Sequence, residues 1–255
     1  MKRKNVLKVL SLPLTALMLV SGWQIYSALS IQQKAKEEFA DLAALVAPPV
    51  AKPTTAALLE ENAPSQESTE PTEVLRDLTE LFAQNAECIG WLSILETERD
   101  YPVMHTPNEP QKYLYRSFYG EYSPNGVPFL DFRCDETSNL IIYGHNMRMS
   151  GTMFAPLINY TDADFCAEHP VIELQTAAGL SQYTVFAVAE VQKTDAWYKF
   201  IRATSRMEFD EQIAALLDKA NYPTGVSPAY GQQLLTLSTC YGGEDGRLII
   251  AAVKT

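Results

Sequence analysis

Short apolar runs separated by turn-forming residues dominate the second half of the chain. They are rich in β-branched and aromatic residues, which favour strands, and Gly, Pro, Asn and Asp stand between them. The runs are YPVM at 101–104, VPFLD at 127–131, NLIIY at 139–143, PVIELQT at 170–176 and QYTVFAVAEV at 182–191. The pattern predicts a mostly antiparallel β domain.

Two segments carry apolar residues at helical spacing instead. One follows Thr72, a suitable N-cap, and predicts a helix that opens the domain. The other follows Ser205 and Glu208, a capping-box pair, and predicts a helix inserted between the late strands. The spaced apolar residues are Leu75, Leu78 and Phe82 in the first segment and Phe209, Ile213, Leu216 and Leu217 in the second.

The segment LLTLSTCYGGEDGRLII at 234–250 holds the most reactive side chain of the domain. Two apolar runs bracket a Gly-rich acidic turn, which predicts a hairpin. Cys240 ends the first run and Arg247 opens the second, so we expect them to be cross-strand partners on one face of the sheet. An exposed ion pair with Glu244 or Asp245 is the alternative role for Arg247.

A histidine also stands at a predicted strand exit. His145 follows NLIIY and Gly144, and such loop edges on a rigid scaffold favour chemistry. The other two histidines, His105 and His169, are not accompanied by other candidate catalytic residues and are interpreted as structural or surface residues.

The N-terminal segment reads as a membrane anchor. The run from Val9 to Ile31 has no charged residue and is long enough to span a bilayer, with basic residues before it. We therefore expect residues 1–35 to form a basic cytoplasmic tip and a retained anchor, with the bulk of the chain outside. A signal peptide cleaved near Ala28-Leu29-Ser30 is the alternative.

Composition changes after the anchor. Residues 36–71 are rich in Pro, Ala, Glu and Thr and are expected to form an extracellular linker after a short helix, with the catalytic domain at 72–255. Residues 1–36 hold six of the 20 basic residues and no acid, which leaves 14 basic against 31 acidic residues beyond them, a formal charge of −17. That balance argues against nucleic acid as a partner.

Several motifs together resemble the sortase family, most closely class B. They are IGWL followed by YPVM, VPFLDFR, YGHNM followed by GTMF, and LSTC with an Arg shortly after it, between Glu87 and Val253. Sortases are membrane-tethered cysteine transpeptidases of mainly Gram-positive bacteria. The resemblance implies a closed eight-stranded β-barrel with an N-terminal helix and a helix before the cysteine-bearing strand.

The resemblance also implies site residues. The catalytic ones are His145, Cys240 and Arg247, and the substrate-groove residues are Leu114, Tyr143 and Ser238, with Trp197 and Tyr198 as an opposite wall. The implied reaction cleaves a sorting motif after its Thr, holds the acyl group as a thioester, and passes it to an amine. The implied partners are surface proteins bearing the motif and an amine acceptor of a peptidoglycan precursor. Pilin polymerisation and an inactive wall-binding module are the alternatives.

The remaining cysteines do not form a recognisable framework. A disulfide among Cys88, Cys134 and Cys166 stays open, although a domain of this size needs none. No C-x-x-C or H-E-x-x-H motif is present, so we expect neither a metal nor a cofactor. Papain-like and caspase-like hydrolases are disfavoured because their cysteine contexts are missing and His145 precedes Cys240.

Overall fold

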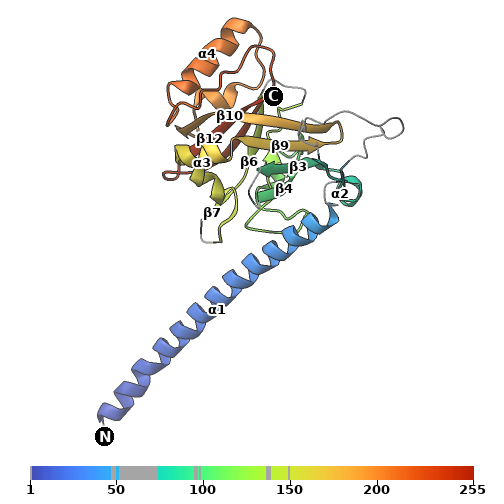
Figure 1. The fold of residues 1–255 in the computed structure, drawn as a ribbon. Helices are drawn as coiled ribbons and strands as arrows, with labels where there is room; N and C mark the ends of the chain where they lie inside the picture. The colour runs from blue at the N-terminus through green and yellow to red at the C-terminus, as the bar shows by residue number, and fades with distance from the viewer. Residues whose placement is uncertain are drawn as a thin grey trace, which may run out of the picture. The chain divides into compact units, whose positions relative to one another are not determined.

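The computed structural model describes residues 2–46, 50–51, 74–94, 97, 99–135, 139–148 and 150–255. The chain divides into two compact units, Met1–Ala40 and Asp41–Thr255. Helix α1 spans Lys2–Leu45 (Figure 1). Among the described residues, no helix combines the length and the apolar character needed to cross a membrane. Most of the linker predicted at 36–71 lies outside the described residues.

Eight strands of the second unit close into a barrel in the order β10-β12-β11-β6-β5-β4-β3-β9. Their bounds are β3 Cys88–Ile94, β4 Arg99–Met104, β5 Phe129–Leu130, β6 Asn139–Tyr143, β9 Val171–Thr176, β10 Gly179–Gln192, β11 Leu234–Cys240 and β12 Gly246–Lys254. The pairs β4–β5 and β6–β11 are parallel and the other neighbours are antiparallel. The predicted closed, mostly antiparallel barrel is confirmed.

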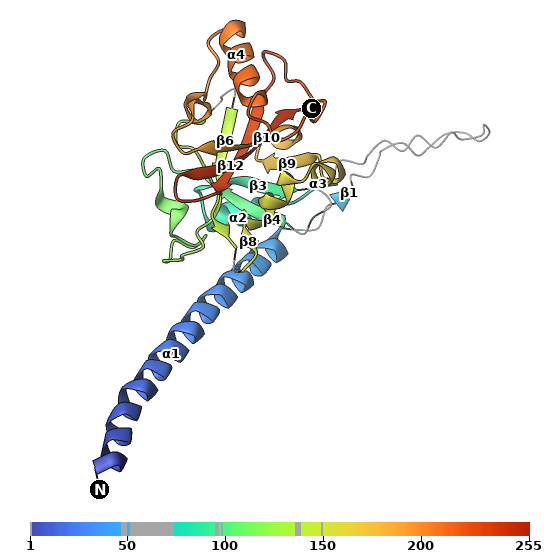
Figure 2. The same ribbon diagram turned by 90° about the vertical axis from the view of Figure 1, so that its left-hand side faces the viewer.

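Smaller elements lie around the barrel (Figures 1 and 2). The helices are α2 Thr79–Gln84, α3 Ala163–Glu168 and α4 Arg206–Leu217, with 3-10 turns η1 Lys112–Leu114, η2 Ala155–Thr161 and η3 Ala196–Lys199. Two short pairs complete the set, β1 Val50–Ala51 with β2 Val74–Leu75, and β7 Asn146–Met147 with β8 Thr152–Met153. Helix α4 is the predicted insertion between β10 and β11.

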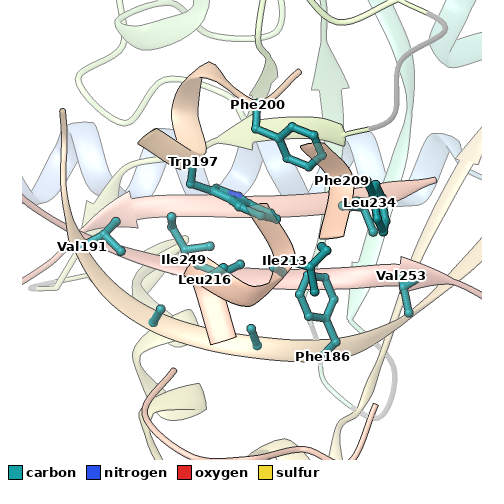
Figure 3. Packing of buried hydrophobic residues seen from close by; sticks show 13 residues of the cluster. Phe186, Val191, Trp197, Phe200, Phe209, Ile213, Leu216, Leu234, Ile249 and Val253 are labelled. Carbon is teal, nitrogen blue, oxygen red and sulfur yellow. The ribbon is translucent and has the colours of Figure 1, made fainter. Parts of the chain in front are cut away.

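Strand β12 is buried on both faces, which explains its unbroken apolar sequence LIIAAV. Ile249, Ala251 and Val253 belong to a cluster that includes Phe209 and Ile213 of α4 (Figure 3). Because side chains alternate along a strand, the equally buried residues between them face the opposite side, the barrel interior. Burial on both faces removes the polar alternation that marks a half-exposed strand.

The start of α4 carries the predicted cap in modified form. Ser205 Oγ accepts a hydrogen bond from the Glu208 amide at 3.2 Å, as the capping box requires. The Glu208 carboxylate accepts from the amide of Thr204 at 2.8 Å instead of from that of Ser205. The helix is confirmed, and its carboxylate satisfies an amide one residue further out.

The predicted start of the opening helix is wrong. Thr72 lies outside the described residues, Leu75 belongs to β2, and α2 begins only at Thr79. The side-chain amide of Gln175 accepts from the Arg76 amide at 2.9 Å and donates to the Arg76 carbonyl at 2.6 Å. These bonds replace those of a helical turn, so a tertiary contact overrides the local periodicity.

Candidate active site

The hairpin at the end of the chain places a thiol opposite a guanidinium. Strands β11 and β12 pair in a register that sets Cys240 opposite Arg247, as predicted. The turn between them is closed by the Tyr241 amide, which donates to the Gly246 carbonyl at 3.0 Å. A Cβ at Gly246 would lie 2.0 Å from the Tyr241 carbonyl oxygen, so the turn requires glycine there.

The loop that carries His145 is joined directly to the strand that carries Cys240. The parallel pairing of β6 with β11 ends at Tyr143, opposite Ser238. Beyond it, three hydrogen bonds continue the connection: Gly144 N to Ser238 O at 3.1 Å, Thr239 Oγ1 to Gly144 O at 2.8 Å, and Asn146 Nδ2 to Cys240 O at 2.7 Å. His145 therefore stands beside the end of the cysteine-bearing strand, although the two residues are far apart in sequence.

Two contacts hold the His145 ring, one with a backbone carbonyl and one with an aromatic ring. Nε2 lies 2.8 Å from the Leu114 carbonyl oxygen, which can only accept, so Nε2 carries a proton and donates it. The Tyr115 ring is tilted against the imidazole with centroids 5.5 Å apart. A Cβ at Gly126, which has φ of +59°, would lie 2.6 Å from the Leu114 oxygen. Nδ1 is therefore the nitrogen left for proton transfer.

A cavity of about 480 Å³ brings most of the predicted site together. Its lining includes all three predicted catalytic residues, His145, Cys240 and Arg247, and four of the predicted groove residues, Leu114, Tyr143, Tyr198 and Ser238. The side chains come from η1, η3, β6, β11 and β12 and the loop after β6.

Trp197 is the predicted groove residue that the structure places elsewhere. Its indole is buried in the cluster between α4 and the barrel, where ring centroids of Phe200 and Phe186 lie 5.4 and 6.4 Å away (Figure 3). Its Nε1 donates to Thr236 Oγ1 at 3.0 Å, which satisfies its polar atom. The expectation that Trp197 forms a groove wall is thus corrected, and Tyr198 alone supplies that wall.

Arg247 is oriented by backbone carbonyls. Nη1 donates to the carbonyl oxygens of Glu244 at 3.0 Å and Gly246 at 2.8 Å. The Asp245 carboxylate instead pairs with Lys193 at 2.6 Å, and that hydrogen bond lowers its pKa. Among the described residues, no carboxylate lies within 4.0 Å of the Arg247 guanidinium. Its positive charge remains unpaired by an acid at the cavity.

A buried carboxylate at the cavity was not singled out from the sequence. Asp131 follows β5 and is 5% exposed, and Arg133 binds it through Nε at 2.8 Å and Nη2 at 2.7 Å. Tyr143 donates its hydroxyl to the same carboxylate at 2.9 Å. Burial alone would raise the pKa of Asp131, but these hydrogen bonds outweigh it and hold the pKa below its usual value. The signal in the sequence is a carboxylate directly after the apolar run VPFL.

All four cysteines are free thiols, so the disulfide left open by the sequence is not formed. Cys88, Cys134 and Cys166 are buried, and burial raises the pKa of the Cys88 thiol to about 11. Cys240 is exposed. Because the thiolate is the reactive form and needs access to a substrate, Cys240 is the one cysteine placed for nucleophilic chemistry.

Comparisons with known proteins all point to the same family. Residues 92–255 match the family described as the sortase domain. A Sortase B of Listeria monocytogenes is 32% identical over 259 residues, covering 98% of this chain and 97% of the relative. The Staphylococcus aureus sortase B-substrate complex has a TM-score of 0.64 at 25% identity and covers 69% of this chain and 83% of its own. A sortase B complexed with triglycine has the same score and identity and covers 69% and 84%.

The barrel and these matches define an enzyme class, the cysteine transpeptidases. The chain belongs to the sortase family, and the relatives that it resembles are sortases of class B.

Proposed function

We propose that Cys240 is the nucleophile, His145 the proton donor and acceptor, and Arg247 the electrostatic stabiliser of a peptide transpeptidation. The observation that carries the proposal is that these three side chains line one cavity at the ends of β6, β11 and β12. Exposure of the Cys240 thiol and a guanidinium without a carboxylate partner among the described residues support the same roles.

The first half-reaction forms a thioester. Thiolate Cys240 attacks the carbonyl carbon of the Thr residue in a sorting motif, and the carbonyl electrons move onto oxygen. As the tetrahedral intermediate collapses, the C–N bond breaks and His145, as imidazolium, gives its proton to the leaving amine. The acyl group remains on Cys240 and His145 is left neutral.

The second half-reaction transfers the acyl group. An incoming amine attacks the thioester carbon, and neutral His145 takes the proton that the nitrogen loses. The C–S bond breaks, a new amide forms, and the thiolate and imidazolium are restored. Water in place of the amine gives hydrolysis through the same steps.

Arg247 stabilises the charge that develops on the carbonyl oxygen in both halves. A guanidinium has five donors in a fixed plane, and Nη1 is already bonded to the carbonyls of the Glu244–Gly246 turn. That attachment preorganises the cation, so little rearrangement is needed as the oxyanion forms.

The partners of this reaction are a surface protein with a C-terminal sorting motif and an amine of the cell wall. Named relatives support this: one solved structure is a sortase B-substrate complex and another is a sortase B complexed with triglycine. We propose that this chain likewise takes a motif-bearing peptide and a peptide amine, and attaches surface proteins to the wall.

We further propose that residues 1–35 hold the enzyme at the cell membrane, with the unit Asp41–Thr255 outside. The support is the uncharged run from Val9 to Ile31 with basic residues ahead of it. Fractionation of cells that produce the full chain tests this: the enzyme should be found with membranes, and should be released when residues 1–35 are deleted.

The reaction is tested with a panel of motif peptides incubated with the enzyme, with and without triglycine. The expected result is cleavage after Thr and, with triglycine, a ligated product identified by mass spectrometry. Cys240→Ala is the control that should yield neither. Absence of cleavage across a panel that other class B sortases accept would contradict the proposal.

A further inference from the structure

We infer that Asp131 and Arg133 are positioning residues for Tyr143 and Tyr198, two of the tyrosines that line the cavity and are here called its walls. By fixing these walls they set how tightly the cavity binds the substrate peptide. Neither residue is assigned a role by the cysteine chemistry itself. The inference rests on the proposed function, because it concerns the groove that binds the peptide.

Asp131 holds the first wall, Tyr143. In the β5–β6 pair Phe129 stands opposite Tyr143, which puts Asp131 two residues further along, at the diagonal position. From there its Oδ2 accepts the Tyr143 hydroxyl at 2.9 Å, while the Phe129 ring lies against the Tyr143 ring with centroids 5.6 Å apart. The ring of Tyr143 is therefore fixed at its face and at its hydroxyl.

Arg133 holds the second wall, Tyr198. The same Nη2 that binds Asp131 Oδ2 at 2.7 Å also donates to the Tyr198 carbonyl oxygen at 2.8 Å, which ties η3 to the end of β5. The Tyr198 ring stacks on Tyr143 at 6.2 Å between centroids and 25° between planes. Two walls from distant parts of the chain thus share one carboxylate–guanidinium pair.

The contacts that link Asp131 to Tyr198 continue to the strand that carries Cys240. The Tyr198 hydroxyl lies 2.7 Å from Ser238 Oγ, and Ser238 is two residues before Cys240 on the same face of β11. Asp131, Tyr143, Tyr198 and Ser238 all line the cavity. The chain of contacts runs from the buried carboxylate to the strand that carries the thiol.

The Asp131 carboxylate is buried, with 5% of its side chain exposed, whereas the Arg133 side chain is 36% exposed. Desolvation opposes a buried charge, so the carboxylate depends on the hydrogen bonds that it accepts. Here the carboxylate accepts two bonds from the guanidinium side chain, a third from the Arg133 amide at 3.0 Å and a fourth from Tyr143. A planar two-pronged pair fixes direction as well as distance, which a single lysine contact does not.

The test compares Asp131→Asn, Arg133→Lys and Tyr143→Phe with wild type. The matched control is Asp135→Asn, since Asp135 pairs with Arg202 at 2.9 Å on the same loop but with 73% and 59% of the two side chains exposed. Each variant is assayed for kcat and KM with a cleaved motif peptide, and for the rate at which iodoacetamide alkylates Cys240.

If the pair positions the walls, KM should rise about tenfold in Asp131→Asn and Arg133→Lys and less in Tyr143→Phe, while kcat changes by less than about threefold. Alkylation of Cys240 should match wild type, because the small reagent does not use the groove. Asp135→Asn should behave as wild type. A role confined to stability would lower the melting temperature and leave KM unchanged.

Wild-type KM in all three variants would overturn the inference while leaving the proposed function intact. If Asp131→Asn fails to fold, Tyr143→Phe decides, because it removes one hydroxyl and keeps the ion pair. Lack of cleavage by the wild-type enzyme would instead remove the proposed function, and the inference with it.

Discussion

Asn146 Nδ2 donates a hydrogen bond of 2.7 Å to the carbonyl oxygen of Cys240. The residue after the candidate acid–base thus holds the backbone of the candidate nucleophile. Asn146 begins β7 and Cys240 ends β11, so the bond joins these two strands beyond the last β6–β11 pair, Tyr143 with Ser238. Their separation is therefore fixed by a side chain and not by the barrel alone.

Loss of this bond should reduce activity without unfolding the enzyme. A neutral hydrogen bond contributes about 0.5–1.5 kcal/mol, so Asn146→Ala should lower kcat/KM by about 2- to 12-fold. Asn221→Ala, at an exposed position whose backbone amide keeps its bond to Val188, is the control. Steady-state kinetics that show Asn146→Ala equal to the control would remove the positioning role of Asn146.

One methyl group added at Gly126 should disrupt the hydrogen bond between His145 Nε2 and the Leu114 carbonyl oxygen. In Gly126→Ala the new Cβ would lie 2.5 Å from the Tyr113 carbonyl oxygen and 2.6 Å from the Leu114 carbonyl oxygen, whereas in Gly120→Ala, at φ of +83°, it meets nothing within 4 Å. Both variants bear the left-handed strain of about 1–2 kcal/mol. Displacement of the carbonyl should cost about tenfold or more in kcat/KM for Gly126→Ala only. Equal kcat/KM values for the two variants, at equal melting temperatures, would show that the position of the Leu114 carbonyl does not affect activity.

Substitution of Arg247 by lysine distinguishes the role of the planar guanidinium donors from that of the positive charge. Lysine keeps the charge but not the planar donors, so Arg247→Lys should lose about 2.7–4 kcal/mol of transition-state stabilisation, roughly 100- to 1000-fold in rate. Asp245→Asn, which removes an exposed pair with Lys193, should stay near wild type. Kinetics of Arg247→Lys within about threefold of wild type, less than 1 kcal/mol, would leave Arg247 as an ordinary turn residue.

The N-terminal boundary of the folded domain also gives a prediction. Leu42 and Val46, in the second compact unit, are 0% and 2% exposed. A chain of residues 41–255 should therefore melt higher than one of residues 72–255, since burial of each such side chain stabilises by about 1.5–3 kcal/mol. Leu42→Ala in the longer chain should reproduce part of the loss. Identical melting curves for the two chains would restore a boundary near Thr72.

Local features of the site could be predicted from the sequence. The pairing of Cys240 with Arg247 follows from two apolar runs and a short glycine-rich turn, because hairpin register is set within that segment. The capped helix α4 follows for the same reason. The proximity of His145 to Cys240 depends on the parallel pairing of β6 with β11, and the sequence indicated it only through resemblance to a family.

Features decided by distant contacts could not be predicted. Gln175 binds the backbone of Arg76, which lies outside any helix although helical spacing had assigned it to one. Trp197 and Tyr198 are neighbours, yet the first enters the core and the second lines the cavity, which depends on α4 covering η3. The carboxylate of Asp131 is informative only once Arg133, Tyr143 and the cavity are seen together.

In the proposed reaction, Cys240 carries the acyl group between the two half-reactions. Intact-protein mass spectrometry of the enzyme mixed with a cleaved motif peptide, quenched in acid before an amine is added, tests it most directly. We predict a mass increase equal to the acyl fragment, reversed by hydroxylamine and absent from Cys240→Ala. Peptide cleavage by Cys240→Ala at the wild-type rate, or an adduct that maps to another residue, would contradict a thioester on Cys240.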